Sequence, residues 1–98
     1  VKAGVLDFTI TTRAPAEWAR HFRGIDLEAK KIGGRLSTDQ ARWIVGLRED
    51  EHFADWFEGT HAGLDILRKL GWNVDAALGR IASRGEVLDE SGKLVRSK

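Results

Sequence analysis

The chain of 98 residues contains no cysteine, and its only proline is Pro15. Without cysteine it can form neither a disulfide framework nor a thiolate metal site, and it has no thiol nucleophile. No apolar run approaches the ~20 residues of a membrane-spanning helix, so we expect no membrane partner. Nothing resembles a linker, and the length suits one domain over residues 1–98. We expect this domain to be cytoplasmic.

The charge is nearly balanced overall but unevenly distributed along the chain. The net charge is +1, yet residues 1–36 carry a net +3, residues 37–65 a net −5 and residues 66–98 a net +3. This basic–acidic–basic order predicts two separate electrostatic faces, or alternatively an ordinary solvated surface.

Alternation of apolar and polar residues predicts a strand over Val5–Thr12. Pro15 occupies a typical first helical position and predicts a helix that ends near Gly24. Asp26 can cap a short helix over Leu27–Ile32, which the following glycines would end.

Two further helices are expected in the middle of the chain. Ser37 and Gln40 have capping-box spacing. The apolar run 41–47 that follows could be helix or strand, and the cap favours helix. Asp50 can cap another helix to about Gly59, in which Phe53, Trp56 and Phe57 would form one apolar stripe.

The last third reads as helix, turn, helix and hairpin. A helix from Thr60 or His61 to Leu70 would end at Gly71, and Asn73 would cap a helix over Val74–Ser83. Beyond Gly85, two short β-prone runs flank a polar turn and predict a hairpin. The N-terminal strand could pair with this hairpin. The expected fold is therefore α+β and mostly helical, with an N-terminal strand, four to five short helices and a C-terminal β-hairpin.

The segment AALGRIASRGEVLDESGKLVRS resembles the recognition helix, second strand and wing of winged helix-turn-helix proteins, which places a winged-helix-like unit within residues 60–98. The resemblance implies that the outer face of Val74–Ser83 enters the DNA major groove, with the hairpin and the preceding helix on the phosphates. The implied nucleic-acid-binding residues are Arg68, Lys69, Arg80, Ser83, Arg84, Lys93 and Arg96. Equally, this unit could simply close the fold.

Residue patterns typical of catalysis or metal binding are weak. His21, His52 and His61 are not spaced as a zinc motif, and no serine stands in a nucleophile elbow. The middle carboxylates have the spacing of one solvated helix face. The sequence thus favours a protein that is not an enzyme, with no catalytic residues, no metal and no cofactor.

Two functions remain open. The first is a non-enzymatic regulator or accessory factor that binds double-stranded DNA. The alternative is a small protein-interaction module or inhibitor, of the type that phages and mobile elements encode. Its partner protein would bind the acidic, tryptophan-rich middle, whose residues are Asp50, Glu51, Asp55, Trp56 and Glu58. The oligomeric state is open, and a homodimer is compatible with the sequence.

Overall fold

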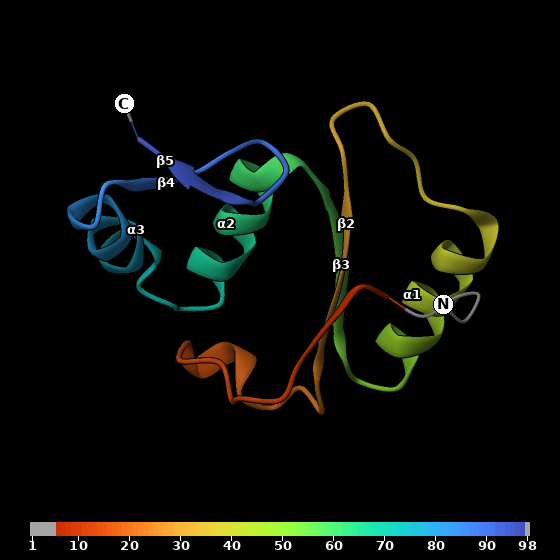
Figure 1. Ribbon diagram of the computed structural model, residues 1–98. Coiled ribbons are helices and arrows are strands. Elements are labelled where there is room, and N and C mark those ends of the chain that lie inside the picture. The colour runs from red at the N-terminus through yellow and green to blue at the C-terminus, as the bar shows by residue number, and fades with distance from the viewer. Residues whose placement is uncertain (1–5, 98) are drawn as a thin grey trace.

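The computed structural model describes residues 6–97 and is built around a three-stranded sheet (Figure 1). Its strands are β1 (Phe8–Ile10), β2 (Ile25–Lys30) and β3 (Phe53–Glu58). The spatial order is β1-β2-β3, so β2 is paired on both sides. β1 runs antiparallel to β2, whereas β3 runs parallel to it.

Helices cover both faces of this sheet. α1 (Thr38–Glu49) connects β2 to β3, because parallel neighbours need a crossover connection, and it packs on one face through Ile44. α2 (Gly59–Lys69) follows β3 directly and packs on the opposite face through Ile66. Figure 1 shows the sheet edge-on, with α1 and α2 on its two sides.

The last elements form a helix–hairpin unit beside α2. α3 (Val74–Ser83) follows α2 after a short turn, and β4 (Glu86–Leu88) pairs antiparallel with β5 (Leu94–Arg96) in a sheet of their own. The Thr60 hydroxyl of α2 donates a hydrogen bond to the Asp89 carbonyl at 2.6 Å, which ties the hairpin to the start of α2. This unit lies on the α2 side of the central sheet (Figure 1).

Both faces of β2 are buried, and they differ in chemistry. Successive strand residues point to opposite faces. Ile25 and Leu27 point toward α2 and join the buried core that contains Leu70. Asp26 and Glu28 point toward α1 and are also buried. The central strand therefore presents apolar side chains to one helix and carboxylates to the other.

Local signals in the sequence are confirmed where they cap helices. The capping box is present, because Gln40 N donates to Ser37 Oγ at 3.1 Å and Ser37 N donates to Gln40 Oε1 at 2.9 Å. Residues 41–47 are therefore helical. Asn73 caps α3 by accepting from Ala76 N, and Gly71 ends the preceding helix with φ +104°.

The prediction of a mostly helical fold with four to five short helices is wrong. The described residues form three α-helices, one 3-10 helix at Glu17–Ala19 and five strands in two small sheets. The helix expected over Leu27–Ile32 overlaps β2. Asp26 caps nothing there, because its carboxylate accepts a hydrogen bond from the Thr9 hydroxyl across the sheet.

The helix expected from Asp50 to Gly59 is also wrong, because this stretch contains β3. Phe53 and Phe57 are four residues apart, a spacing that fits one face of a helix and equally one face of a strand. In β3 they pack on the α2 side, whereas Trp56 packs on the α1 side with Ile44. Pairing with the neighbouring strand β2 therefore decided that this segment is a strand and not a helix.

The N-terminal strand is shorter than predicted and pairs elsewhere. β1 begins at Phe8, and Val5, where the predicted strand starts, lies outside the described residues. β1 pairs with β2 and not with the hairpin. The predicted order of helix, turn, helix and hairpin within residues 60–98 is present. Among residues 6–97, no helix combines the length and apolarity that crossing a bilayer requires.

Gly46 lies in the middle of α1, and no atom lies within 4 Å of the position a Cβ would occupy. Glycine in a helix interior costs about 0.5–1 kcal/mol relative to alanine. We therefore expect Gly46→Ala to raise the free energy of unfolding by about 0.5–1 kcal/mol in urea denaturation. Gly71→Ala is the contrasting control and should be destabilising, because φ is positive and Ala16 backbone atoms lie close to the added Cβ. A less stable Gly46→Ala protein would contradict the first expectation.

Candidate active site

Three ionisable residues alternate along the α1 face of β2. Asp26 and Glu28 are only 7% and 3% exposed. The side chain of Lys30, the next residue on this face, is 21% exposed. Burying a carboxylate is unfavourable unless it is paired or hydrogen-bonded. The partners of each carboxylate therefore indicate what it does.

Glu28 has partners from two other segments of the chain and from its own strand. Asp7 N donates to Oε1 at 3.1 Å, and Gln40 Nε2 of α1 donates to Oε2 at 2.9 Å. Lys30 Nζ lies 3.5 Å from the same Oε2. Gln40 is itself fixed by the capping box at the start of α1. We call Asp7, Glu28, Lys30 and Gln40 the carboxylate site.

Two carboxyl groups of this site lie side by side. Asp7 Oδ2 accepts from Ala29 N at 3.0 Å, which holds the Asp7 side chain against β2 beside Glu28. Burial raises the pKa of Glu28 above its ordinary value of 4.5, and the neighbouring carboxyl group of Asp7 raises it further. Adjacent carboxyl groups repel when both are ionised. Their presence is typical of a functional site.

The donor set of the carboxylate site fits a hard divalent cation. Mg²⁺ is commonly held by one or two carboxylates, together with water and substrate phosphates. Within residues 6–97 there is no group of three or more His, Cys, Asp or Glu that could hold a metal ion. A cation between Asp7 and Glu28 would therefore depend on water and substrate for its other ligands, and it would remove the repulsion between the two carboxylates.

Asp26, two residues earlier on β2, has a different environment. The Thr9 hydroxyl donates to Oδ1 at 3.0 Å, and His52 Nδ1 lies 2.8 Å from Oδ2. Both carboxylate oxygens therefore have a partner. The hydroxyl points to the carboxylate and not to the imidazole, so the three residues lack the order of a nucleophilic triad. They connect β1, β2 and the turn before β3, and we assign them to stability.

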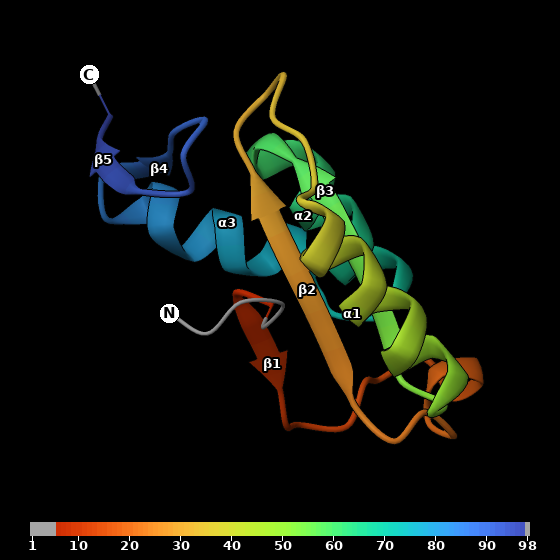
Figure 2. The same cartoon turned by 90° about the vertical axis from the view of Figure 1, so that its right-hand side faces the viewer.

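A basic loop leaves the carboxylate site. It runs from the end of β2 to the start of α1, at one end of both elements (Figure 2). Gly33 N donates to Glu58 Oε2 at 3.0 Å, which fixes the loop to the end of β3. The loop carries Lys31 and Arg35, both exposed, and neither forms an ion pair with a carboxylate of residues 6–97. The loop therefore adds two exposed positive charges after the end of β2, and Lys31 also lines an apolar cavity on the other face of the sheet.

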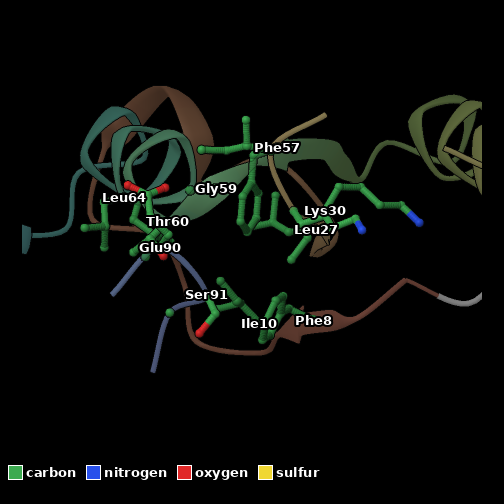
Figure 3. Close-up of a pocket in the computed structure, with 16 residues that line it drawn as sticks. Phe8, Ile10, Leu27, Lys30, Phe57, Gly59, Thr60, Leu64, Glu90 and Ser91 are labelled. Atoms are coloured by element: carbon green, nitrogen blue, oxygen red, sulfur yellow. The ribbon is translucent and has the colours of Figure 1, made fainter. Parts of the chain in front are cut away.

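An apolar cavity lies on the opposite face of the sheet (Figure 3). Its volume is about 690 Å³, and its walls include Ile10, Leu27, Phe57 and Leu64. The Lys30 side chain extends away from it in Figure 3. Lys30, Lys31 and Glu90 are the titratable residues among those that line it. The walls of this cavity are mostly apolar, whereas the carboxylate site consists of polar and charged side chains.

The residues predicted to bind nucleic acid lie on α2, α3 and the hairpin, across the sheet from α1 (Figure 1). Arg68 is engaged by Asp75 at 2.8 Å and by Asp65 at 2.7 Å, and these hydrogen bonds raise its pKa. Arg84 lies 3.4 Å from Glu86. The remaining members, Lys69, Arg80, Ser83, Lys93 and Arg96, are exposed. Binding of DNA by this set stays a prediction.

The residues predicted to bind a protein partner do not share one helix face. Asp50 and Glu51 lie in the turn after α1, whereas Asp55, Trp56 and Glu58 lie on β3. Asp55 and Trp56 are neighbours in a strand and so point to opposite faces. Trp56 is half-buried against the core below α1. A role for this set in protein binding also stays a prediction.

The sequence did contain a signal for the carboxylate site. Asp26, Glu28 and Lys30 stand at alternate positions, a pattern that places three charges on one face of a strand. In a helix, the same three residues would not share one face. Asp7 and Gln40 gave no sign of belonging with Glu28, since only the sheet and the crossover helix bring them together.

The Glu28 pKa makes stability depend on pH. Folded Glu28 keeps its proton above pH 4.5, where the unfolded chain loses it, so the free energy of unfolding falls as pH rises from about 4.5 through the folded pKa. Asp7→Asn removes one charge and offers an amide donor to Glu28. We expect this variant to be more stable than the wild type at pH 7 and less sensitive to pH, in urea denaturation with EDTA. Lower stability at pH 7 would show that the carboxyl pair stabilises the fold.

Comparison with known proteins adds no relative to this picture. No family model, no curated protein and no solved structure matches the chain. Its function is therefore argued from the geometry of the carboxylate site.

Proposed function

We propose that this protein hydrolyses phosphodiester bonds of nucleic acid, with a divalent metal ion held by Asp7 and Glu28. One observation carries the proposal. A buried carboxylate with a raised pKa lies beside a second carboxyl group and 3.5 Å from a lysine ammonium. A cation and a phosphate together satisfy all three groups, because the cation takes the carboxylates and the phosphate takes the lysine.

Each residue has a distinct role in the proposal. Asp7 and Glu28 supply the two protein ligands. A bound divalent ion supplies polarisation of a phosphoryl oxygen and makes water a stronger nucleophile. Lys30 holds a phosphate oxygen and stabilises the negative charge that grows there as water attacks. Gln40 is a positioning residue, since its amide fixes the orientation of Glu28.

The balance of the reaction is simple. The oxygen of one water molecule bonds to phosphorus, and the bond from phosphorus to the leaving ester oxygen breaks. The proton that water loses is replaced by one that the leaving oxygen gains, so the products are a phosphomonoester and a free hydroxyl group. No oxidant, reductant or organic cofactor is required.

A nucleic-acid substrate is favoured by the basic loop. Lys31 and Arg35 follow Lys30 along the chain and extend the positive charge beyond a single phosphate. A polyanion fits this arrangement better than a small ester does. The sequence favoured DNA binding without catalysis, and the geometry of Asp7 and Glu28 favours cleavage. The basic residues of α3 and the hairpin remain a proposed second contact for DNA.

Cleavage of labelled single-stranded and duplex DNA tests the proposal. With Mg²⁺ or Mn²⁺ we expect cleavage that EDTA abolishes. Asp7→Asn and Lys30→Met should each lower the rate about 100-fold or more, the scale seen when one preorganised group that stabilises a transition state is removed. Arg13→Ala, which changes an exposed arginine after β1 that belongs neither to the carboxylate site nor to the predicted DNA-binding set, should cleave at the wild-type rate.

The stability of the variants separates chemistry from unfolding. Asp7→Asn is expected to be more stable than the wild type, so loss of cleavage in this variant cannot come from loss of the fold. Cleavage that persists in both Asp7→Asn and Lys30→Met would rule out the carboxylate site. Absence of cleavage by the wild-type protein with either metal would do the same.

A further inference from the structure

A second feature lies on the flank of α1. Trp43 is 47% exposed, although it is among the largest apolar side chains of the protein. It borders a hollow of about 590 Å³ whose other walls are Gly46, Leu47, Glu49 and Asp50. We call these five residues the Trp43 slot. None of them belongs to the carboxylate site.

The slot lies on an exposed flank of α1. Gln40 reaches Glu28 on β2, whereas Arg48 donates to the Ala54 carbonyl on β3 at 2.8 Å. At about 100° per residue, Trp43 is turned about 60° from Gln40 in the direction away from Arg48. Gly46, at the centre of the slot, is turned about 120° from Gln40 in the same direction and lies about 9 Å from it along the helix axis.

The walls of the slot have complementary chemistry. The Trp43 indole offers a flat face for stacking, and Leu47 is a half-buried apolar neighbour. Gly46 has no side chain, and nothing lies within 4 Å of the point where a Cβ would stand, which leaves the space between Trp43 and Asp50 open. The Glu49 and Asp50 carboxylates at the rim accept hydrogen bonds only. Asp50 Oδ1 also forms an ion pair with Arg23 Nη1, at a distance of 3.3 Å.

We propose that the Trp43 slot binds one unpaired nucleobase that carries an exocyclic amino group, with cytosine as the clearest case. The base stacks on Trp43, and its amino group donates to the rim carboxylates, as acidic side chains do with cytosine N4. Thymine is disfavoured because it presents a carbonyl oxygen where cytosine presents the amino group.

This inference rests on the proposed function, from which it takes nucleic acid as the substrate. It adds that the substrate is single-stranded near the cut. At about 3.4 Å rise per stacked nucleotide, the separation between Gln40 and the slot corresponds to two or three nucleotides. The strand that is cut at Glu28 would therefore be unpaired a few nucleotides from the cut. Duplex with no single-stranded segment would not fill the slot.

Binding without catalysis tests the slot independently. Fluorescence anisotropy in EDTA would follow labelled oligodeoxycytidine and oligothymidine of about 12 nucleotides, within the usual range of single-strand sites. We expect wild-type protein to prefer oligodeoxycytidine. Trp43→Ala should weaken its binding by about 5- to 150-fold, the range for loss of one stacked base. Glu49→Ala should reduce the preference for cytosine over thymine.

Two further variants on α1 distinguish a specific effect at the slot from a general effect on the helix. Gly46→Leu fills the slot and should weaken oligodeoxycytidine binding, whereas Val45→Ala, at a residue 57% exposed on the outer face of α1, should leave it unchanged. Circular dichroism would confirm that each variant is folded. If Trp43→Ala and Gly46→Leu both bound oligodeoxycytidine with wild-type affinity, the proposal that the Trp43 slot binds a base would be wrong. Equal affinity of the wild type for the two oligonucleotides would overturn the assignment to an amino-bearing base.

The two proposals can fail separately. If Asp7→Asn and Lys30→Met cleave normally while Trp43→Ala no longer binds oligodeoxycytidine, the proposal for the Trp43 slot is supported and the proposal for the carboxylate site is wrong. If cleavage depends on Asp7 while Trp43→Ala binds oligodeoxycytidine as the wild type does, the proposal for the carboxylate site is supported and the proposal for the slot is wrong.

Discussion

The central position of β2 is the constraint on which the rest of the molecule depends. This strand is hydrogen-bonded on both edges, to β1 and to β3, and a helix packs across each of its faces. Parallel pairing with β3 requires a crossover, and α1 supplies it. Every side chain of β2 from Ile25 to Glu28 is therefore buried, whatever its polarity. Two carboxylates in that stretch must find partners inside the protein.

Asp26 and Glu28 meet this requirement in different ways. Asp26 has a partner on each oxygen, Thr9 and His52. Glu28 has donors too, but it also faces the carboxyl group of Asp7, and its pKa is raised. Natural proteins give up stability in this way where function needs it. The contrast between these two residues of one strand face is the reason that we propose a functional role for Glu28 and not for Asp26.

The two sides of the sheet divide the surface of the molecule. The α1 side holds the carboxylate site and the Trp43 slot, and the basic loop connects β2 to α1 at one end of the sheet. The α2 side holds the apolar cavity and the helix–hairpin unit. The hydrogen bond from the Thr60 hydroxyl to the Asp89 carbonyl ties the hairpin to α2. The carboxylate site and the predicted winged-helix surface therefore lie on opposite sides of the central sheet.

Local sequence determined the features whose partners are near in the chain. Ser37 and Gln40 start α1, Asn73 starts α3, Gly71 ends α2, and the turn at Asp89 forms the hairpin, because each depends on contacts within a few residues. The strand identity of 25–30 and 53–58 depended on pairing between segments far apart, and short apolar runs fit either period. The carboxylate site was beyond local reading for the same reason. Asp7 and Glu28 are 21 residues apart, and only the β1–β2 pairing and the crossover helix bring both carboxyl groups, Lys30 and Gln40 to one point.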